Sequence, residues 1–155
     1  MKKTVRTDLI LAACNALSAS KYGKLDDADK IKVWKISRVL QPFAKQFDDD
    51  RMDAGKKLLP TEDFEERWQN AAEYERVSRD SNADASTLKM GPAEYNVFIK
   101  EKIKYDKLVS EAIKDLAEKE VEIEFEPLTE DSFVKLMNSN DWTFDQVRIL
   151  GEILM

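Results

Sequence analysis

Two long segments whose apolar side chains recur at helical spacing constrain the fold of this chain most. In residues 33–47 the apolar positions are separated by three or four residues, and Pro42 lies inside the pattern. A second, broader apolar face extends over residues 95–116. Such spacing places side chains on one face of an α-helix, and two antiparallel helices can bury their apolar faces against each other. We therefore expect an antiparallel helical hairpin, with Pro42 kinking or dividing its first helix.

The clearest strand pattern is the strict alternation EVEIEFE at Glu120–Glu126. A period of two places the glutamates on one face of a strand and Val121, Ile123 and Phe125 on the other. We predict that the apolar face packs on the core and that the acidic face meets solvent or a partner. A lone strand is not stable, so it needs a second strand. The short segment around Val5 is the best candidate.

Shorter patterns complete the expected fold. Thr143 and Gln146 have the spacing of a capping box, in which two side chains satisfy each other's backbone donors at the start of a helix. Further helical segments are predicted at residues 8–21, 61–74 and 130–137. A length of 155 residues is typical of one domain. The sequence thus predicts a single, mainly α domain over residues 1–155: an antiparallel helical hairpin or bundle, crossed by the terminal helices, with a minor two-stranded β element.

Residues 78–91 are expected to form a flexible loop, because small polar residues dominate this segment. Asp80, Asn82 and Asp84 match the first three ligand positions of a calcium-binding loop. However, Gly91 occupies the position that requires a bidentate glutamate. We therefore favour an ordinary solvated loop, and we expect neither a metal ion nor a cofactor.

The absence of histidine excludes most familiar catalytic arrangements. The chain has one cysteine, Cys14, and no histidine, so neither a Ser-His-Asp nor a Cys-His site can form. An enzyme would have to rely on other groups, such as two carboxylates that converge in a deep pocket. The sequence gives no sign of such a pair, so we expect a protein without enzymatic activity.

The same composition favours the interior of a cell. A single cysteine cannot form an internal disulfide, which suits a reducing compartment. The apolar run Leu9–Ala13 is too short for a signal peptide, and no run approaches the roughly 18 apolar residues of a membrane span. We therefore expect a soluble intracellular protein that makes no membrane contact.

The net charge of the chain is −6, which disfavours binding to nucleic-acid phosphates. We interpret the lysines of residues 30–35 and 100–107 as parts of surfaces interrupted by acidic residues, without an uninterrupted basic face carrying interleaved aromatics. Direct nucleic-acid binding is therefore not predicted. The expected partner is another protein or a second copy of this chain.

Two features are candidates for partner binding. The first is the acidic strand face, formed by Glu120, Glu122, Glu124 and Glu126. This face could dock on a basic protein, although a solvated face that discourages aggregation is the interpretation we favour. The second is Trp142, which precedes the terminal helix. An aromatic side chain there can pack on a partner subunit, although packing within the chain is the more common role.

The order of several segments resembles a family of small tailed-bacteriophage proteins of unknown function. The resemblance is carried by Asn15-Ala16-Leu17, by IKVWKISRVL at Ile31–Leu40, and by EVEIEFEPL at Glu120–Leu128, followed by a short C-terminal helix. It covers residues 1–60 and 93–155, and residues 61–92 resemble an insertion relative to the shorter members.

This resemblance implies a viral protein that works by contact and transfers no catalytic residues. The expected function is that of a phage virion or assembly component acting through protein–protein contacts. The alternative is a small phage inhibitor that docks on a host or defence protein through its acidic surface. Either would be located in the bacterial host cytoplasm, and the first also in the virion.

Overall fold

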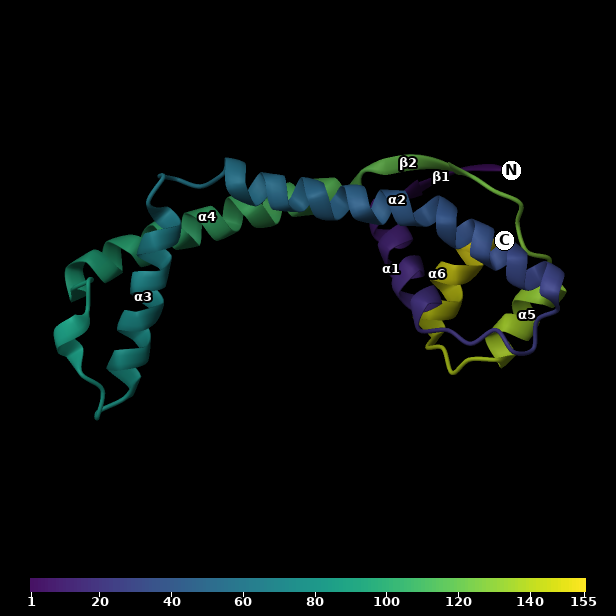
Figure 1. The fold of residues 1–155 in the computed structure, drawn as a ribbon. Coiled ribbons are helices and arrows are strands. Elements are labelled where there is room, and N and C mark those ends of the chain that lie inside the picture. The colour runs from purple at the N-terminus through teal and green to yellow at the C-terminus, as the bar shows by residue number, and fades with distance from the viewer. The chain divides into compact units, whose positions relative to one another are not determined.

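The computed structural model describes all residues from 1 to 155 and consists of six α-helices, one 3-10 turn and a two-stranded antiparallel sheet (Figure 1). The elements in chain order are β1 (Lys2–Arg6), α1 (Thr7–Ser18), α2 (Asp27–Lys57), α3 (Phe64–Arg79), η1 (Ala85–Thr87), α4 (Pro92–Glu118), β2 (Glu120–Glu124), α5 (Glu130–Asn138) and α6 (Phe144–Leu154). The expected mainly α fold with a minor β element is confirmed. None of the helices combines the length and apolar character needed to cross a membrane.

The chain divides into two compact units. Unit 1 comprises Met1–Arg51 and Lys114–Met155, and unit 2 comprises Met52–Ile113. Helices α2 and α4 each continue from one unit into the other without a break, so no loop separates the two units. Compactness is a geometric property, whereas a domain is defined by cooperative folding. The expectation of a single domain therefore remains a prediction.

Unit 1 is built around a mainly aliphatic core to which α1, α2, α5, α6 and both strands contribute. Helices α1 and α6 lie side by side (Figure 1). The largest fully buried side chains of this core are Ile10, Ile36, Leu40, Ile123, Leu136, Leu150, Ile153 and Leu154. Almost all of them come from positions where the sequence has an apolar residue every three or four places, so burial of these faces accounts for the packing.

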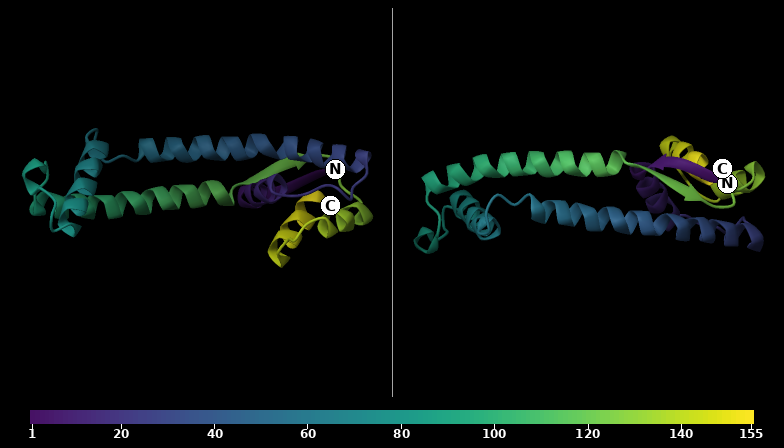
Figure 2. Two further views of the ribbon diagram at one scale, coloured as in Figure 1. Left: turned by 60° about the horizontal axis from the view of Figure 1, so that its bottom comes forward. Right: turned by 90° about the horizontal axis from the view of Figure 1, so that it is seen from above.

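The two strands pair as the sequence predicts. The two strands lie side by side (Figure 2), with Val5 of β1 opposite Val121 of β2 in an antiparallel register. Ile123 and Phe125 are buried, and Val121 packs against the same core. The main chain continues the pairing past β2, since the N-terminal amine of Met1 donates to the carbonyl oxygen of Phe125 at 3.0 Å. Burial of the apolar face therefore determines the register, as expected for a period of two.

The capping box at the start of α6 is also confirmed. The hydroxyl of Thr143 accepts from the backbone N–H of Gln146, and the side chain of Gln146 accepts from the backbone N–H of Thr143. By contrast, Pro42 does not divide α2, which continues as one helix to Lys57. Pro42 is on the exposed side of the helix, where water can bind the carbonyl that loses its partner.

Unit 2 has a separate, largely aromatic core. Phe64 of α3 is fully buried, and its ring centroid lies 5.2 Å from that of Phe98 and 5.1 Å from that of Tyr105, both on α4. The Tyr105 hydroxyl donates to the carbonyl oxygen of Gly55 at 2.7 Å and so joins α4 to the end of α2. Arg67 and Glu101 form an ion pair at 2.8 Å between α3 and α4.

Helices α2 and α4 approach each other within each unit. In unit 1, Phe43 and Phe47 of α2 line a small cavity together with Leu116 of α4. In unit 2 the contact is the hydrogen bond between Tyr105 and Gly55. Later residues of α2 thus meet earlier residues of α4, which is the antiparallel order of the expected hairpin.

The expected loop begins slightly later than the sequence suggests, because Ser78 and Arg79 belong to α3. The segment that follows contains η1, and the Asp84 side chain caps this turn by accepting from the backbone N–H of Ser86 at 2.8 Å. At its end Met90 is buried in the core of unit 2. The flexibility of residues 78–91 remains a prediction.

Candidate binding surfaces

The four glutamates of the acidic strand face, Glu120, Glu122, Glu124 and Glu126, are all exposed, but they do not form a purely acidic surface. The opposing strand places Lys2, Thr4 and Arg6 on the same side of the sheet. Lys2 Nζ lies 3.0 Å from Glu122 Oε1, and Lys32 Nζ of α2 lies 3.1 Å from Glu126 Oε1. Four carboxylates therefore share this face with three cations.

Arg6 also has a carboxylate partner of its own. Its guanidinium donates to Asp8 at 2.6 Å, and this bond, with Glu118 and Glu120 contributing less, raises the pKa of Arg6. The sequence contained part of this signal, since Lys2 and Arg6 lie four residues apart and therefore fall on the same face of a strand. The acidity of the face depends on the strand pairing, because the glutamates come from one segment while the cations come from the other strand and from α2.

Trp142 makes its contacts within the chain. Its indole N–H donates to the Ser20 hydroxyl oxygen at 3.0 Å, and its ring centroid lies 6.1 Å from that of Phe133. Nearby, the Asn140 side chain binds both the N–H and the carbonyl oxygen of Lys21. These contacts attach the end of α1 to the segment between α5 and α6. The side chain is half-buried, and its use by a partner remains a prediction.

Other aromatic side chains, which the sequence analysis did not select, are much more exposed. Phe144, the first residue of α6, is 84% exposed, and Trp34 on α2 is 56% exposed. The signal for Trp34 was available in its spacing. It lies one position past Val33 and two before Ile36, which are both buried, so its side chain points away from the core.

The outer side of α2 in unit 1 combines aromatic and basic groups. We call it the α2 basic face. Its exposed residues are Lys30, Ile31, Trp34, Lys35, Arg38 and Lys45. The Arg38 guanidinium lies 5.0 Å from the centroid of the Trp34 ring, a cation–π distance. The expectation that acidic residues interrupt this region is wrong, because the chain from Lys30 to Phe47 contains no acidic residue.

A small cavity opens beside the α2 basic face. It has a volume of about 260 Å³ and is lined by Tyr22, Lys30, Val33, Trp34 and Ser37. The Tyr22 hydroxyl donates to the carbonyl oxygen of Leu17 at 2.5 Å, which fixes the ring, and burial raises the pKa of this phenol. The cavity can therefore hold an apolar group with a cationic side chain at its edge.

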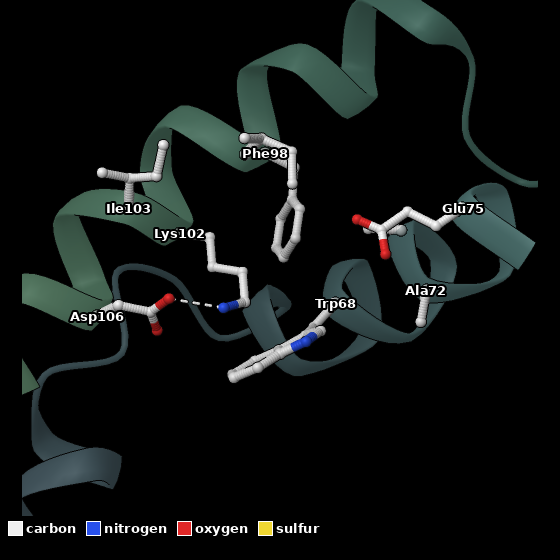
Figure 3. Close-up of a pocket in the computed structure, with 9 residues that line it drawn as sticks. Trp68, Ala72, Glu75, Phe98, Lys102, Ile103 and Asp106 are labelled. Carbon is white, nitrogen blue, oxygen red and sulfur yellow. Dashed lines mark hydrogen bonds and ion pairs between the residues drawn. The ribbon is translucent and has the colours of Figure 1, made fainter.

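Unit 2 has a cavity of its own, of about 310 Å³, against Trp68 and Phe98 (Figure 3). Lys102 lines it, with Nζ 4.5 Å from the centroid of the Trp68 ring and 2.6 Å from Asp106 Oδ2. Glu75, on the α3 side, accepts a hydrogen bond from the Tyr95 hydroxyl, and this bond raises the pKa of Tyr95. The charged groups around this cavity are thus already paired with one another or with neighbours.

The remaining sequence candidates have structural explanations. Asp80 and Asp84 accept from the backbone N–H groups two residues ahead, at 3.0 and 2.8 Å, so they stabilise turns. The structure brings no three acidic or cysteine side chains together in a way that could hold a metal ion. Partial burial raises the pKa of Cys14, which keeps the thiol protonated at neutral pH and makes it a poor nucleophile.

Comparison with known proteins found no matching family, no matching curated protein and no matching solved structure.

Proposed function

We propose that this protein acts by binding other proteins, as a virion or assembly component of a tailed phage. The observation that carries the proposal is the exposure of large aromatic side chains on a chain whose buried polar atoms all have hydrogen-bond partners. Trp34 and Phe144 lie mainly in solvent. By contrast, every buried side-chain nitrogen and oxygen atom has a hydrogen-bond partner.

Exposed aromatic groups of this kind are suited to protein contacts. Burial of apolar area is worth about 25 cal/mol per Å², and Trp, Tyr and Arg are the residues most enriched among those that dominate binding energy. On the α2 basic face Trp34 and Arg38 lie against each other, with Tyr22 lining the adjoining cavity. This grouping supports a contact surface better than the acidic strand face does.

The phage context rests on the resemblance of residues 1–60 and 93–155 to small tailed-phage proteins. Mass spectrometry of purified phage particles tests it. We expect the protein at a fixed number of copies per particle, retained after washing in high salt. Its absence from both mature particles and assembly intermediates would contradict the proposal.

The alternative, an inhibitor that docks through its acidic strand face, has less support. Lys2 and Lys32 neutralise part of that face, so a basic partner would have to compete with ion pairs already made. This alternative predicts early expression, absence from particles, and one host protein captured by the tagged chain.

A further inference from the structure

We infer that the α2 basic face binds an acidic amphipathic helix of a partner protein, with an apolar side chain of that helix inserted in the cavity beside Trp34. The inference rests on the proposed function, because it names the surface and the chemistry of a protein contact. It differs from the acidic docking surface considered above in its location and in the sign of its charge.

The charge of this face is unusual for the chain. The protein carries a net charge of −6, yet the stretch from Lys30 to Phe47 contains no acid and five cations, of which all but Lys32 lie on this face. Only Lys32 has a close carboxylate, Glu126 at 3.1 Å, while Lys30 lies 3.9 Å from the fully exposed Asp27. Lys35, Arg38 and Lys45 have no ion-pair partner among the salt bridges. Unpaired cations on one helical face attract an acidic partner.

Apolar groups on the same face supply an anchor. Ile31 is 53% exposed and Trp34 56%, and the residues that line the adjoining cavity include Tyr22 and Val33. Within unit 1 the other elements lie on the opposite side of this part of α2, which leaves the outer side uncovered (Figure 2, right). A partner helix with an apolar stripe and acidic flanks matches both the cavity and the cations.

The extent of the face favours a short acidic helix over a nucleic acid. Acidic residues bound it at both ends: Asp26 and Asp27 before it, Asp48 and Asp49 after it. The helical stretch from residue 30 to residue 47 spans about 27 Å at a rise of about 1.5 Å per residue. A helical peptide fits between these limits, whereas a longer phosphate backbone would meet repulsion at each end and from the net charge of the chain.

Fluorescence anisotropy with the full chain and three labelled probes tests the inference. The first probe is an 18-residue helical peptide with a leucine stripe and glutamate flanks, and the second replaces its leucines by alanine. The third is an 18-nucleotide oligothymidylate. We expect the leucine peptide to bind with an affinity that falls as salt rises. The alanine peptide should bind about tenfold more weakly, a loss of about 1.4 kcal/mol. Tighter binding of the oligonucleotide, equal binding of the two peptides, or no binding of the leucine peptide overturns the inference.

Matched variants locate the site. The double variant Lys35→Glu/Arg38→Glu should weaken binding of the leucine peptide at least about tenfold, and Trp34→Ala by a similar factor, as expected for central interface residues. The control Lys104→Glu/Lys107→Glu makes the same charge change at exposed positions of α4 in unit 2 and should leave binding unchanged. Circular dichroism checks that each variant is folded. Equal effects of the two double variants would overturn the inference.

Phage particles made with the Lys35→Glu/Arg38→Glu variant separate this inference from the proposed function. Loss of the variant from particles, with the control variant retained, supports both. Incorporation of both variants overturns the inference and leaves the proposed function standing. Absence of the wild-type protein from particles and intermediates, with peptide binding intact, overturns the proposed function but not the inference that the α2 basic face binds an acidic helix.

Discussion

The contacts that stabilise the interior of unit 1 differ in kind from those that stabilise the interior of unit 2. In unit 1 the partners are far apart in the sequence: β1 pairs with β2, α1 packs on α6, and the backbone N–H of Leu128 donates to the carbonyl oxygen of Leu154. In unit 2 a few aromatic rings on α3 and α4 form most of the core. Stability should therefore be spread over many side chains in unit 1 and concentrated in a few in unit 2.

The strongest test of this comparison is Phe64→Ala. The ring is fully buried against Phe98 and Tyr105, so its loss should cost about 3–5 kcal/mol, the usual range for a buried phenylalanine. Hydrogen exchange should accelerate in α3, whereas α1 and α6 keep their protection. Equal acceleration in both units would contradict this comparison and would support the single cooperative domain over residues 1–155 that the sequence predicts.

The counterpart in unit 1 is Phe125→Ala. Its side chain is buried below the strands but retains slight exposure, so we expect a loss near the lower end of that range, about 3 kcal/mol. Denaturant unfolding monitored through amides of β1 and β2 measures it. A loss as large as that of Phe64→Ala, or one confined to unit 2, would contradict the proposed spread of stability in unit 1.

A smaller effect is expected at the start of α6. Thr143→Ala removes one half of the capping box and should lower the stability of unit 1 by about 1 kcal/mol. Thr143→Ser keeps the hydroxyl and serves as the control. If both variants unfold at the wild-type temperature, the cap contributes nothing to the stability of unit 1.

The smallest effect is expected on the acidic strand face. Changing Glu120, Glu122, Glu124 and Glu126 together to glutamine removes the ion pairs with Lys2 and Lys32 but also relieves repulsion among the glutamates. Because these groups are exposed, the net change in stability should stay within about 1 kcal/mol. Thermal unfolding at low and high salt measures it. Unfolding of the variant would mean that the face has a structural role.

Local patterns were sufficient to predict much of the fold. The alternation at Glu120–Glu126 fixed which side chains face inward, and the apolar spacing in residues 33–47 and 95–116 predicted two long helices, because both periods follow from backbone geometry alone. The capping box at Thr143 and Gln146 was equally local. The end of α3 was misjudged, since Ser78 and Arg79 are polar but remain helical.

The candidate site was less predictable. The four glutamates were found on one face, but the cations beside them come from another strand and from α2, so their net effect depended on the pairing. Trp142 was predicted as a partner-binding residue from its position before the last helix, and the structure shows its indole N–H donating a hydrogen bond to Ser20. Phe144 was missed, because nothing in the sequence shows whether the first residue of a helix has a neighbour to cover it.

The sequence by itself determined the secondary structure, the apolar faces and the exclusion of histidine chemistry, since these depend on residue type and on spacing along the chain. Only the tertiary structure decided that two cores form, that lysines and an arginine accompany the glutamates, and that Lys35 and Arg38 near Trp34 remain without carboxylate partners. These properties depend on which distant segments meet. Burial, the balance of charge and exposure are set by neighbours in space, which local spacing does not specify.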